Sequence, residues 1–345
     1  MHELRAAAAP YRTHMPHARS ITYSTRKSGF DIPQDLHTAN RAMPSVVSLL
    51  LRLVYPAKML AIVGAVLGGL ALFGLYAFQS LLIYPASLND GHGYCATPAE
   101  LAMPDYEELY LDTEDGVLLQ CYVLRHDAAS PLYTNKTVLI LSPNAGNIGH
   151  ALQIVAIFYK SFGYNVLIYS YRGYGKSLGK PLEAGLKLDA KRILDYVTKE
   201  DIQLLQSSLV LYGRSLGGAV AIYIAATYPL AVLGLILENT FLLIPKTVPH
   251  IFPMLRYFAV FVNQVWDSER LVPLIPESIP LLLLSARNDE IVPPEHMDRI
   301  HQLLRALLKS MIKFENSAHN DTVAQPAYWD KVHEFIRDYV NPAGY

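Results

Sequence analysis

The chain has 345 residues, of which 52% are hydrophobic and 17% charged, and its formal net charge is −1 at pH 7. A chain of this length and apolar content can bury a sizeable core. Its near-neutral charge argues against a nucleic acid as a partner, because phosphate binding draws on an excess of Lys and Arg.

The first predicted element is an apolar helix. No Asp, Glu, Lys or Arg occurs from Met59 to Asn89, and about 20 such residues in a helix are enough to cross a bilayer. The run also contains several glycines, which membrane helices tolerate better than soluble core helices do. We therefore expect a transmembrane anchor over residues 56–84, preceded by a poorly ordered cytosolic tail over residues 1–55.

The charges that flank this run predict its orientation. Lys and Arg outnumber Asp and Glu in residues 1–58, whereas the chain after the run carries only acidic charges until Arg125. The positive-inside tendency then places the tail in the cytosol and the rest of the chain in the lumen or outside, at the endoplasmic reticulum or plasma membrane. The Arg- and Ser-bearing first 45 residues are also compatible with a mitochondrial presequence, so a mitochondrial membrane is the alternative.

Two small features bear on this orientation. Cys95 and Cys121 both follow the apolar run, and an oxidising lumen would let them pair. Asn135-Lys136-Thr137 matches the acceptor pattern for N-glycosylation.

After the anchor, predicted strands and helices alternate. Strands are expected near residues 107–111, 117–124, 138–141, 166–169, 209–212, 233–237, 281–285 and 312–314. Helices are expected near residues 151–161, 182–198, 216–227, 295–308 and 328–339. Strands joined by helical crossovers form a mostly parallel, eight-stranded sheet with helices on both faces, so we expect one α/β domain over residues 85–345. The Gly-rich segments lack a P-loop lysine and dinucleotide spacing, and no metal-ligating cluster is present, so no cofactor and no metal are expected.

The segment Gly213-Arg214-Ser215-Leu216-Gly217 matches the pattern of a nucleophile elbow. An apolar strand precedes it and a helix rich in small residues follows it, which is the context that the motif requires. A serine on this sharp turn presents its hydroxyl at the carboxyl edge of the sheet, and a Cβ at either flanking glycine would clash with neighbouring backbone. We therefore predict that Ser215 is the nucleophile of an acyl transfer.

Loops after later strands supply the partners of this serine. Asp289 follows the seventh predicted strand and His319 follows the eighth. This is the chain order Ser, acid, His that accompanies a nucleophile elbow. His319 would take the proton of Ser215, while Asp289 fixes the tautomer and orientation of the imidazole. Glu238, after the sixth strand, is the main alternative acid; Asp321 lies two residues past the histidine, from where the chain folds back poorly onto the ring.

The loop after the third predicted strand is placed to complete an oxyanion hole. In this arrangement one donor is a backbone N–H of that loop and the other is the N–H directly after the nucleophile. We predict the N–H groups of Asn144 and Leu216, because Pro143 has no N–H to donate. The alternative for a loop this rich in Gly and Asn is an ordinary turn.

Five separated motifs carry a resemblance to one family. They are Asn144–His150 (NAGNIGH), Tyr171–Ser177 (YRGYGKS), Gly213–Ala221 (GRSLGGAVA), Glu238–Phe241 (ENTF) and His319–Thr322 (HNDT). Together they resemble the family of α/β-hydrolase domain-containing protein 13 and the fungal bud-emergence-protein-type membrane serine hydrolases, over about residues 80 to 340. The resemblance implies an α/β-hydrolase fold, a triad of Ser215, Asp289 and His319, and a single membrane anchor.

The chain departs from the pattern of that family at two places. The family usually has His-Gly where this chain has Ser142-Pro143, and it tends to have Asp at the position of Ser170. The first departure lies in the predicted oxyanion loop and could alter it. The resemblance therefore implies which residues form the triad, but it says less about how fast the chain turns over a substrate.

An apolar insert is expected after the sixth strand, over residues 241–271, where lids and caps of this fold are found. Its large apolar residues are Ile251, Phe252, Met254, Leu255, Tyr257, Phe258, Val260, Phe261, Val262 and Trp266. Two interpretations are open: these side chains pack onto the core of the domain, or they form a hydrophobic wall for an acyl chain.

These features together predict a membrane-anchored serine hydrolase that cleaves an ester or thioester of a hydrophobic acyl group, with a small-molecule or lipid-like substrate. An acyl-protein thioesterase is the alternative within enzymes. A non-catalytic membrane scaffold with a degenerate site is the alternative outside them, and Ser142-Pro143 is the feature that favours it.

Overall fold

The computed structural model describes residues 45–88 and 91–340, so most of the expected tail lies outside the described residues. Helix α1 covers Val46–Ile83. The contacts of the chain divide it after Val63, and the second part of α1 belongs to the same unit as the sheet.

Helix α1 begins earlier than the sequence indicated. Residues 46–55, expected in a poorly ordered tail, are helical, and Pro56 lies inside the helix instead of starting it. Ser45 stabilises the first turn, because its Oγ accepts a hydrogen bond from the N–H of Ser48 at 3.2 Å. The mean hydropathy of α1 reaches 2.2 over an 18-residue window, none of which is buried, so α1 is long and apolar enough to cross a membrane.

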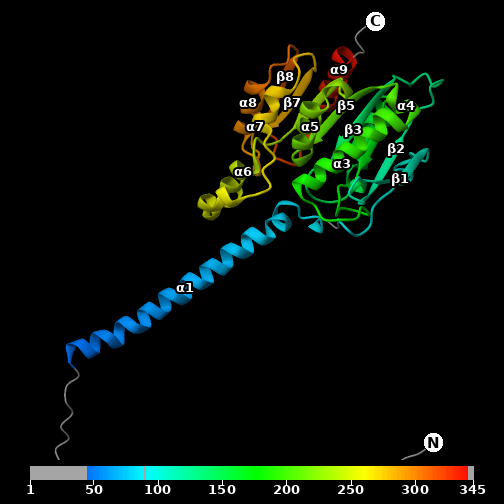
Figure 1. The fold of residues 1–345 in the computed structure, drawn as a ribbon. Coiled ribbons are helices and arrows are strands. Elements are labelled where there is room, and N and C mark those ends of the chain that lie inside the picture. Colours follow the sequence, from blue (N-terminus) through cyan, green and yellow to red (C-terminus); the bar gives the residue numbers. More distant parts are fainter. Residues whose placement is uncertain (1–44, 89–90, 341–345) are drawn as a thin grey trace, which may run out of the picture. The chain divides into compact units, whose positions relative to one another are not determined.

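Eight strands form a single sheet, in the order β1-β2-β4-β3-β5-β6-β7-β8 (Figure 1). Their bounds are Tyr106–Asp112, Leu118–Leu124, Lys136–Leu141, Asn165–Tyr169, Ser208–Arg214, Gly234–Glu238, Leu281–Ala286 and Lys309–Phe314, for β1 to β8. The six strands β3 to β8 run parallel to one another. Strand β2 pairs antiparallel with both β1 and β4. The predicted mostly parallel, eight-stranded sheet is confirmed.

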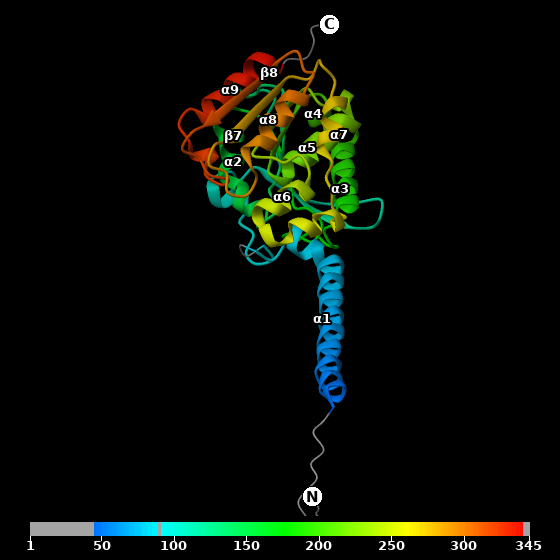
Figure 2. The ribbon, with the colours of Figure 1, turned by 90° about the vertical axis from the view of Figure 1, so that its left-hand side faces the viewer.

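Helices cover both faces of the sheet (Figure 2). Apolar side chains of α3 (Glu183–Asp195), α5 (Leu216–Thr227) and α8 (Pro294–Leu303) share one core with one face. Those of α2 (Leu152–Ala156) and α9 (Tyr328–Tyr339) share a second core with the other face. The remaining α-helices of the described residues are the short α4 (Ile202–Leu205), α6 (Ile244–Ile251) and α7 (Ser268–Leu271). The 3₁₀ helix η7 (Pro253–Phe261) lies between the last two. Because β5 to β8 are parallel, their carboxyl ends meet at one edge of the sheet.

Helix α8 ends at Leu303, although the apolar pattern predicted a helix up to residue 308. Lys309, the first residue of β8, gives the physical reason. Its ammonium group donates hydrogen bonds to the carbonyl of His301 at 3.0 Å and to that of Leu304 at 2.8 Å, which satisfies carbonyls at the helix end.

The two cysteines are free, and both are buried. Cys121 packs in the core that contains α3 and α5, whereas Cys95 packs in the core that contains α2 and α9. The sheet therefore separates the two thiols, and a disulfide between them would require the backbone to move. The pairing that an oxidising lumen would allow is not present.

Candidate active site

Ser215 lies in a strained turn between β5 and α5. Its φ is 50° and its ψ is −115°, a conformation that costs a non-glycine residue about 1–3 kcal/mol and concentrates at functional sites. A Cβ at Gly213 would lie 2.4 Å from the carbonyl oxygen of Gly217, and one at Gly217 would lie 1.9 Å from that of Leu141. Both glycines are therefore required for the close approach of strand and helix, as the sequence predicted.

Asp289 and His319 form a buried pair. The Nδ1 of His319 lies 2.7 Å from one carboxylate oxygen of Asp289 and 2.9 Å from the other. The carboxylate also accepts the backbone N–H groups of Ile291 at 2.9 Å and Val292 at 2.7 Å, both through Oδ1. The acid is thus held by its own loop, and its Oδ2 is directed at the imidazole.

The loop after β6 connects the nucleophile to this pair. The hydroxyl of Thr240 donates to the carbonyl of Ser215 at 2.8 Å, and the side-chain amide of Asn239 donates to the carbonyl of His319 at 3.0 Å. The Oδ1 of Asn239 accepts the N–H of Ala286, the last residue of β7, at 2.8 Å. Four consecutive parallel strands therefore bring the predicted nucleophile, acid and base to one edge. Within the described residues, no hydrogen bond joins Ser215 Oγ to the His319 ring.

Asn239 is the contributor that the reasoning from sequence missed. It has a φ of 45°, and its side chain also donates to Thr322 Oγ1 at 2.8 Å. A signal was present, since Asn239 lies two residues past the predicted strand 233–237, at the edge where the triad gathers. It positions the loops that carry Asp289 and His319 through bonds to the backbone of His319 and Ala286 and to the hydroxyl of Thr322.

The two other acids considered for the triad are engaged elsewhere. Glu238 accepts hydrogen bonds from Arg214 Nε at 3.1 Å and from the hydroxyls of Tyr212 at 2.7 Å and Tyr328 at 2.5 Å. Burial is the largest single influence on the pKa of Arg214 and works to lower it, but the combined attraction of Glu238, Tyr212 and Tyr328 and the hydrogen bond to Glu238 raise the pKa. Asp321 accepts the N–H of Ala318 at 2.8 Å and so closes the turn that carries His319. Neither acid contacts the imidazole.

The loop after β3 is fixed by two tyrosines. The hydroxyl of Tyr171 donates to the carbonyl of Ser142 at 2.9 Å, and that of Tyr174 donates to the carbonyl of Asn144 at 3.0 Å. The backbone N–H of Asn144 has no acceptor among the described residues. The N–H of Leu216, the first residue of α5, has none within its helix and lies at the positive end of the helix dipole. Both predicted donors are therefore left with a free N–H.

Comparison with known proteins places the chain in a family. The family described as Hydrolase_4, serine aminopeptidase S33, matches residues 134–278. The uncharacterized membrane protein YNL320W of Saccharomyces cerevisiae is 42% identical over 240 residues, which cover 70% of this chain and 82% of that protein. Protein bem46 of Schizosaccharomyces pombe is 38% identical over 247 residues, covering 71% and 81%, and the α/β-hydrolase domain-containing protein WAV2 of Arabidopsis thaliana is 36% identical over 252 residues, covering 69% and 79%. The chain belongs to this α/β-hydrolase family.

Solved structures agree on the fold. The esterase Pf2001 of Pyrococcus furiosus superposes with a TM-score of 0.60 at 21% identity, covering 72% of this chain and 95% of the esterase. An α/β-hydrolase of Vibrio vulnificus superposes with a TM-score of 0.61 at 20% identity, covering 75% and 92%. At such identities the likeness shows the α/β-hydrolase fold alone.

In this α/β-hydrolase, a cavity of about 80 Å³ lies beside the loop after β3. Ser142, Pro143 and Ser170, the two places where the chain departs from the usual family pattern, line it together with Tyr169 and Arg214. Within the described part of the chain, the hydroxyls of Ser142 and Tyr169 are the buried side-chain polar atoms that have no hydrogen-bond partner. The two departures therefore border a small cavity beside the predicted oxyanion loop, while the loop backbone keeps its tyrosine contacts.

The insert of this α/β-hydrolase is divided in its packing. Leu242 and Trp266, near its two ends, are buried in the core that contains α3 and α5. Its middle is exposed, and Met254 keeps 90% of its surface accessible. The two ends of the insert therefore pack onto the core of the domain, whereas the apolar side chains of its centre do not.

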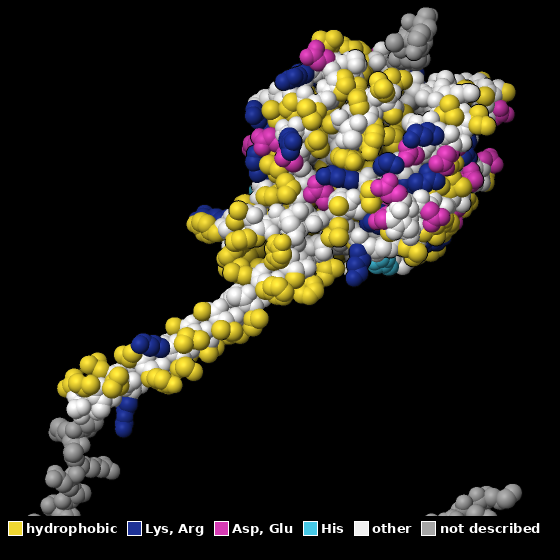
Figure 3. Space-filling model, viewed as in Figure 1, with side chains coloured by type: hydrophobic (Ala, Val, Ile, Leu, Met, Phe, Trp, Pro, Cys, Tyr) yellow, Lys and Arg dark blue, Asp and Glu magenta, His cyan; other side chains and the backbone are white. Residues whose placement is uncertain are grey.

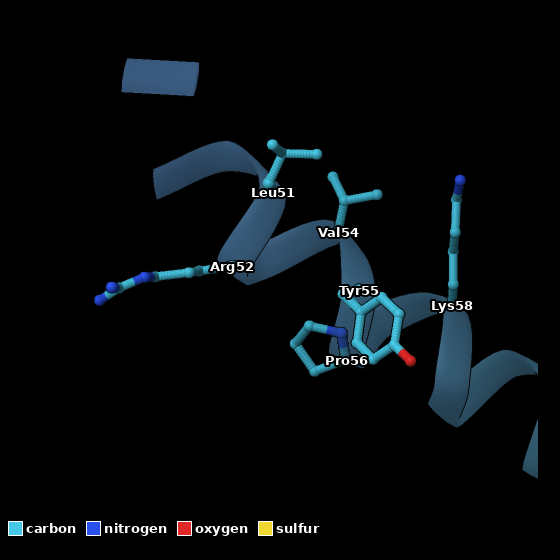
Figure 4. Close-up of a pocket in the computed structure, with 6 residues that line it drawn as sticks. All are labelled: Leu51, Arg52, Val54, Tyr55, Pro56 and Lys58. Carbon is cyan, nitrogen blue, oxygen red and sulfur yellow. The ribbon is translucent and has the colours of Figure 1, made fainter. Parts of the chain in front are cut away.

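A second hollow lies on α1 (Figure 4). It is lined by Leu51, Arg52, Val54, Tyr55, Pro56 and Lys58. All six belong to one helix, so the hollow is a groove along the surface of α1 and adds no group to the candidate active site.

Proposed function

We propose that the chain is a membrane-anchored serine hydrolase that cleaves carboxylic esters or thioesters of hydrophobic acyl groups. Ser215 Oγ attacks the acyl carbon, and His319 takes its proton through Nε2, while Asp289 holds the Nδ1–H side of the ring. The N–H groups of Leu216 and Asn144 stabilise the negative charge that develops on the acyl oxygen. His319 then gives the proton to the leaving alcohol or thiol, and a water molecule, activated by the same histidine, releases the acid from Ser215.

The observation that carries this proposal is the buried Asp289–His319 pair at the sheet edge where Ser215 occupies a strained turn. The distance of 2.7 Å from Nδ1 to Oδ2 fixes the ring with its other nitrogen free to act as a base. Membership of an α/β-hydrolase family that includes a membrane protein of yeast supports both the chemistry and the anchor.

The membrane topology is part of the proposal. We place α1 as a single span with the catalytic domain on the non-cytosolic side of an endomembrane or the plasma membrane. The excess of Lys and Arg before the span, and the acidic chain after it, support this orientation.

Fluorophosphonate labelling of the full-length protein in membranes tests the chemistry. The wild-type protein should react at Ser215, and Ser215→Ala should lose labelling and hydrolysis of p-nitrophenyl esters while remaining folded. Residual hydrolysis above about one part in a thousand would contradict the assignment, since loss of a triad member typically costs more. A wild-type protein that does not label would favour the non-catalytic scaffold.

A further inference from the structure

The centre of the insert exposes an apolar surface. Helix α6 and the 3₁₀ helix η7 carry it, and its exposed large side chains are Ile251, Phe252, Met254, Tyr257, Phe258, Val260 and Phe261, which we call the insert surface. Figure 3 shows apolar side chains gathered over this part of the molecule. Water-soluble proteins rarely expose so many large apolar groups together unless the surface binds something.

Hydrogen bonds hold the insert against the end of α1, within the unit that covers Gly64–Tyr345. Gln79 is the buried residue of α1. Its Oε1 accepts the N–H of Asn263 at 2.8 Å, and its Nε2 donates to the carbonyl of Phe261 at 3.4 Å. Just past the helix, Tyr84 accepts the indole N–H of Trp266 at 2.8 Å. The last residue of the insert surface is therefore fixed beside the last turns of α1.

The position of Gln79 along α1 indicates how deep the insert surface would lie relative to a bilayer that α1 spans. From Met59 to Phe78 the helix carries no charge and no amide, and about 20 helical residues span about 30 Å, the thickness of the hydrocarbon core. Gln79 is the first amide after that stretch. A helix that centres this stretch in a bilayer puts Gln79, and with it the carbonyl of Phe261, at the boundary between acyl chains and headgroups.

We infer that the insert surface lies in the headgroup–acyl boundary of the bilayer that α1 spans, and that its occupant is phospholipid. The inference rests on the anchor in the proposed function and is independent of its chemistry. Helices at this boundary bury their apolar face about 5–10 Å deep, with aromatic rings at headgroup level.

The composition of the insert surface fits this occupant. Tyr257 is an aromatic residue of the kind that gathers at the boundary, and Phe258 and Phe261 are typical of the apolar face of interfacial helices. The guanidinium of Arg256 lies over the ring of Tyr257, with its central carbon 4.4 Å from the ring centre. From there it can reach lipid phosphate while its aliphatic stem stays among apolar groups.

Nitroxide labelling of the full chain in nanodiscs of phosphatidylcholine and phosphatidylserine tests the inference. Single cysteines replace Met254, Leu70 in the middle of α1, and Leu230, a fully exposed control that follows the end of α5 remote from Ser215. The native cysteines do not interfere, because Cys95 and Cys121 are buried and burial raises the pKa of the Cys121 thiol. Electron paramagnetic resonance then measures collisions of each label with oxygen, which dissolves in lipid, and with a water-soluble nickel chelate.

For Met254 we expect an oxygen-to-nickel accessibility ratio several-fold above that of Leu230 and below that of Leu70. A ratio equal to that of Leu230, with Leu70 deep in lipid, would overturn the inference and leave the anchor intact. A ratio at Leu70 that matches Leu230 would refute the anchor, and the inference would fall with it. Low collision rates with both reagents at Met254 would indicate a protein partner or a second copy on the insert surface, and would overturn it too.

A charge variant shows whether the insert surface itself carries the contact. A label at Tyr257→Cys is measured with and without Met254→Asp and Val260→Asp, two changes at exposed positions that leave the core untouched. Carboxylates are costly at the hydrocarbon boundary, so the ratio at Tyr257 should fall toward that of Leu230. An unchanged ratio would mean that α1 alone holds the label near lipid, against the inference.

Discussion

Replacing Asp289 with Asn changes one atom that faces the imidazole and little else. Asp289 Oδ1 receives the N–H groups of Ile291 and Val292, and an asparagine Oδ1 can keep both bonds. The position of Oδ2, 2.7 Å from His319 Nδ1, becomes an NH₂ group. Two donors would then meet, so the ring must carry its proton on Nε2 and offer its Nδ1 lone pair to the amide.

In the Asn variant the ring of His319 keeps its position but carries its proton on Nε2 instead of Nδ1. In that tautomer Nε2 cannot accept the proton of Ser215, so kcat for an ester substrate should fall by about 10⁴-fold, or about 5.5 kcal/mol of transition-state stabilisation. The assay is steady-state hydrolysis of a p-nitrophenyl ester by the full-length protein in detergent, with thermal unfolding measured in parallel.

Matched variants distinguish this explanation from general damage. Asp321→Asn keeps the oxygen that accepts the N–H of Ala318 and should leave kcat close to the wild-type value. Glu238→Gln should lower stability by weakening the buried contact with Arg214, and should affect kcat less than Asp289→Asn. If Asp289→Asn stayed folded with more than a tenth of wild-type activity, or if Glu238→Gln were the more damaging to kcat, the assignment of the acid would be wrong.

Three further outcomes follow from the geometry. Tyr169→Phe removes a buried hydroxyl that has no hydrogen-bond partner among the described residues, so thermal stability should stay the same or rise. The control variant Tyr84→Phe loses the hydrogen bond to Trp266 and should lower thermal stability. Equal losses in the two variants would contradict the description of the cavity. Asn239→Ala should lower kcat by up to about 10²-fold with KM unchanged for a short-chain ester, because misplaced catalytic groups cost turnover; a kcat equal to wild type would remove its positioning role. In sealed microsomes, added protease should trim the N-terminal tail and leave the domain intact, and the exposed Asn135 should carry a glycan that endoglycosidase removes. A domain that is digested without detergent would reverse the orientation and favour a cytosolic S-acylated protein as the substrate.

The sheet could be predicted because each buried strand carries its own signal. Strands such as Leu281–Ala286 are apolar along their whole length, because helices cover both faces of a parallel sheet. Turns and helices separate one such apolar run from the next in the sequence. The limits of helices were less certain where packing or a single side chain sets them. Lys309 ends α8 by binding carbonyls of the preceding turn, and nothing in the apolar pattern reports that contact.

The candidate triad could be predicted because it depends on chain order and strand ends, which the sequence contains. The contacts that hold it together could not. Asn239 reaches the carbonyl of His319 across 80 positions of sequence, and two of its three bonds, to His319 and Ala286, involve backbone atoms that every residue possesses. A side chain that recognises backbone leaves no complementary residue to search for. Such contacts become visible only when the sheet has aligned the ends of β5 to β8, so the support of a site is harder to predict than its reactive groups.

The same argument applies to the insert. Its apolar residues were evident, but sequence could not distinguish core packing from exposure, because both use the same side chains. The exposed side chains of the insert surface decide the question, and Gln79 fixes the end of that surface, at Phe261 and Asn263, next to α1. An apolar segment held there cannot escape water by packing onto the sheet. Its burial must come from outside the domain, and the bilayer expected around α1 is the apolar phase within reach.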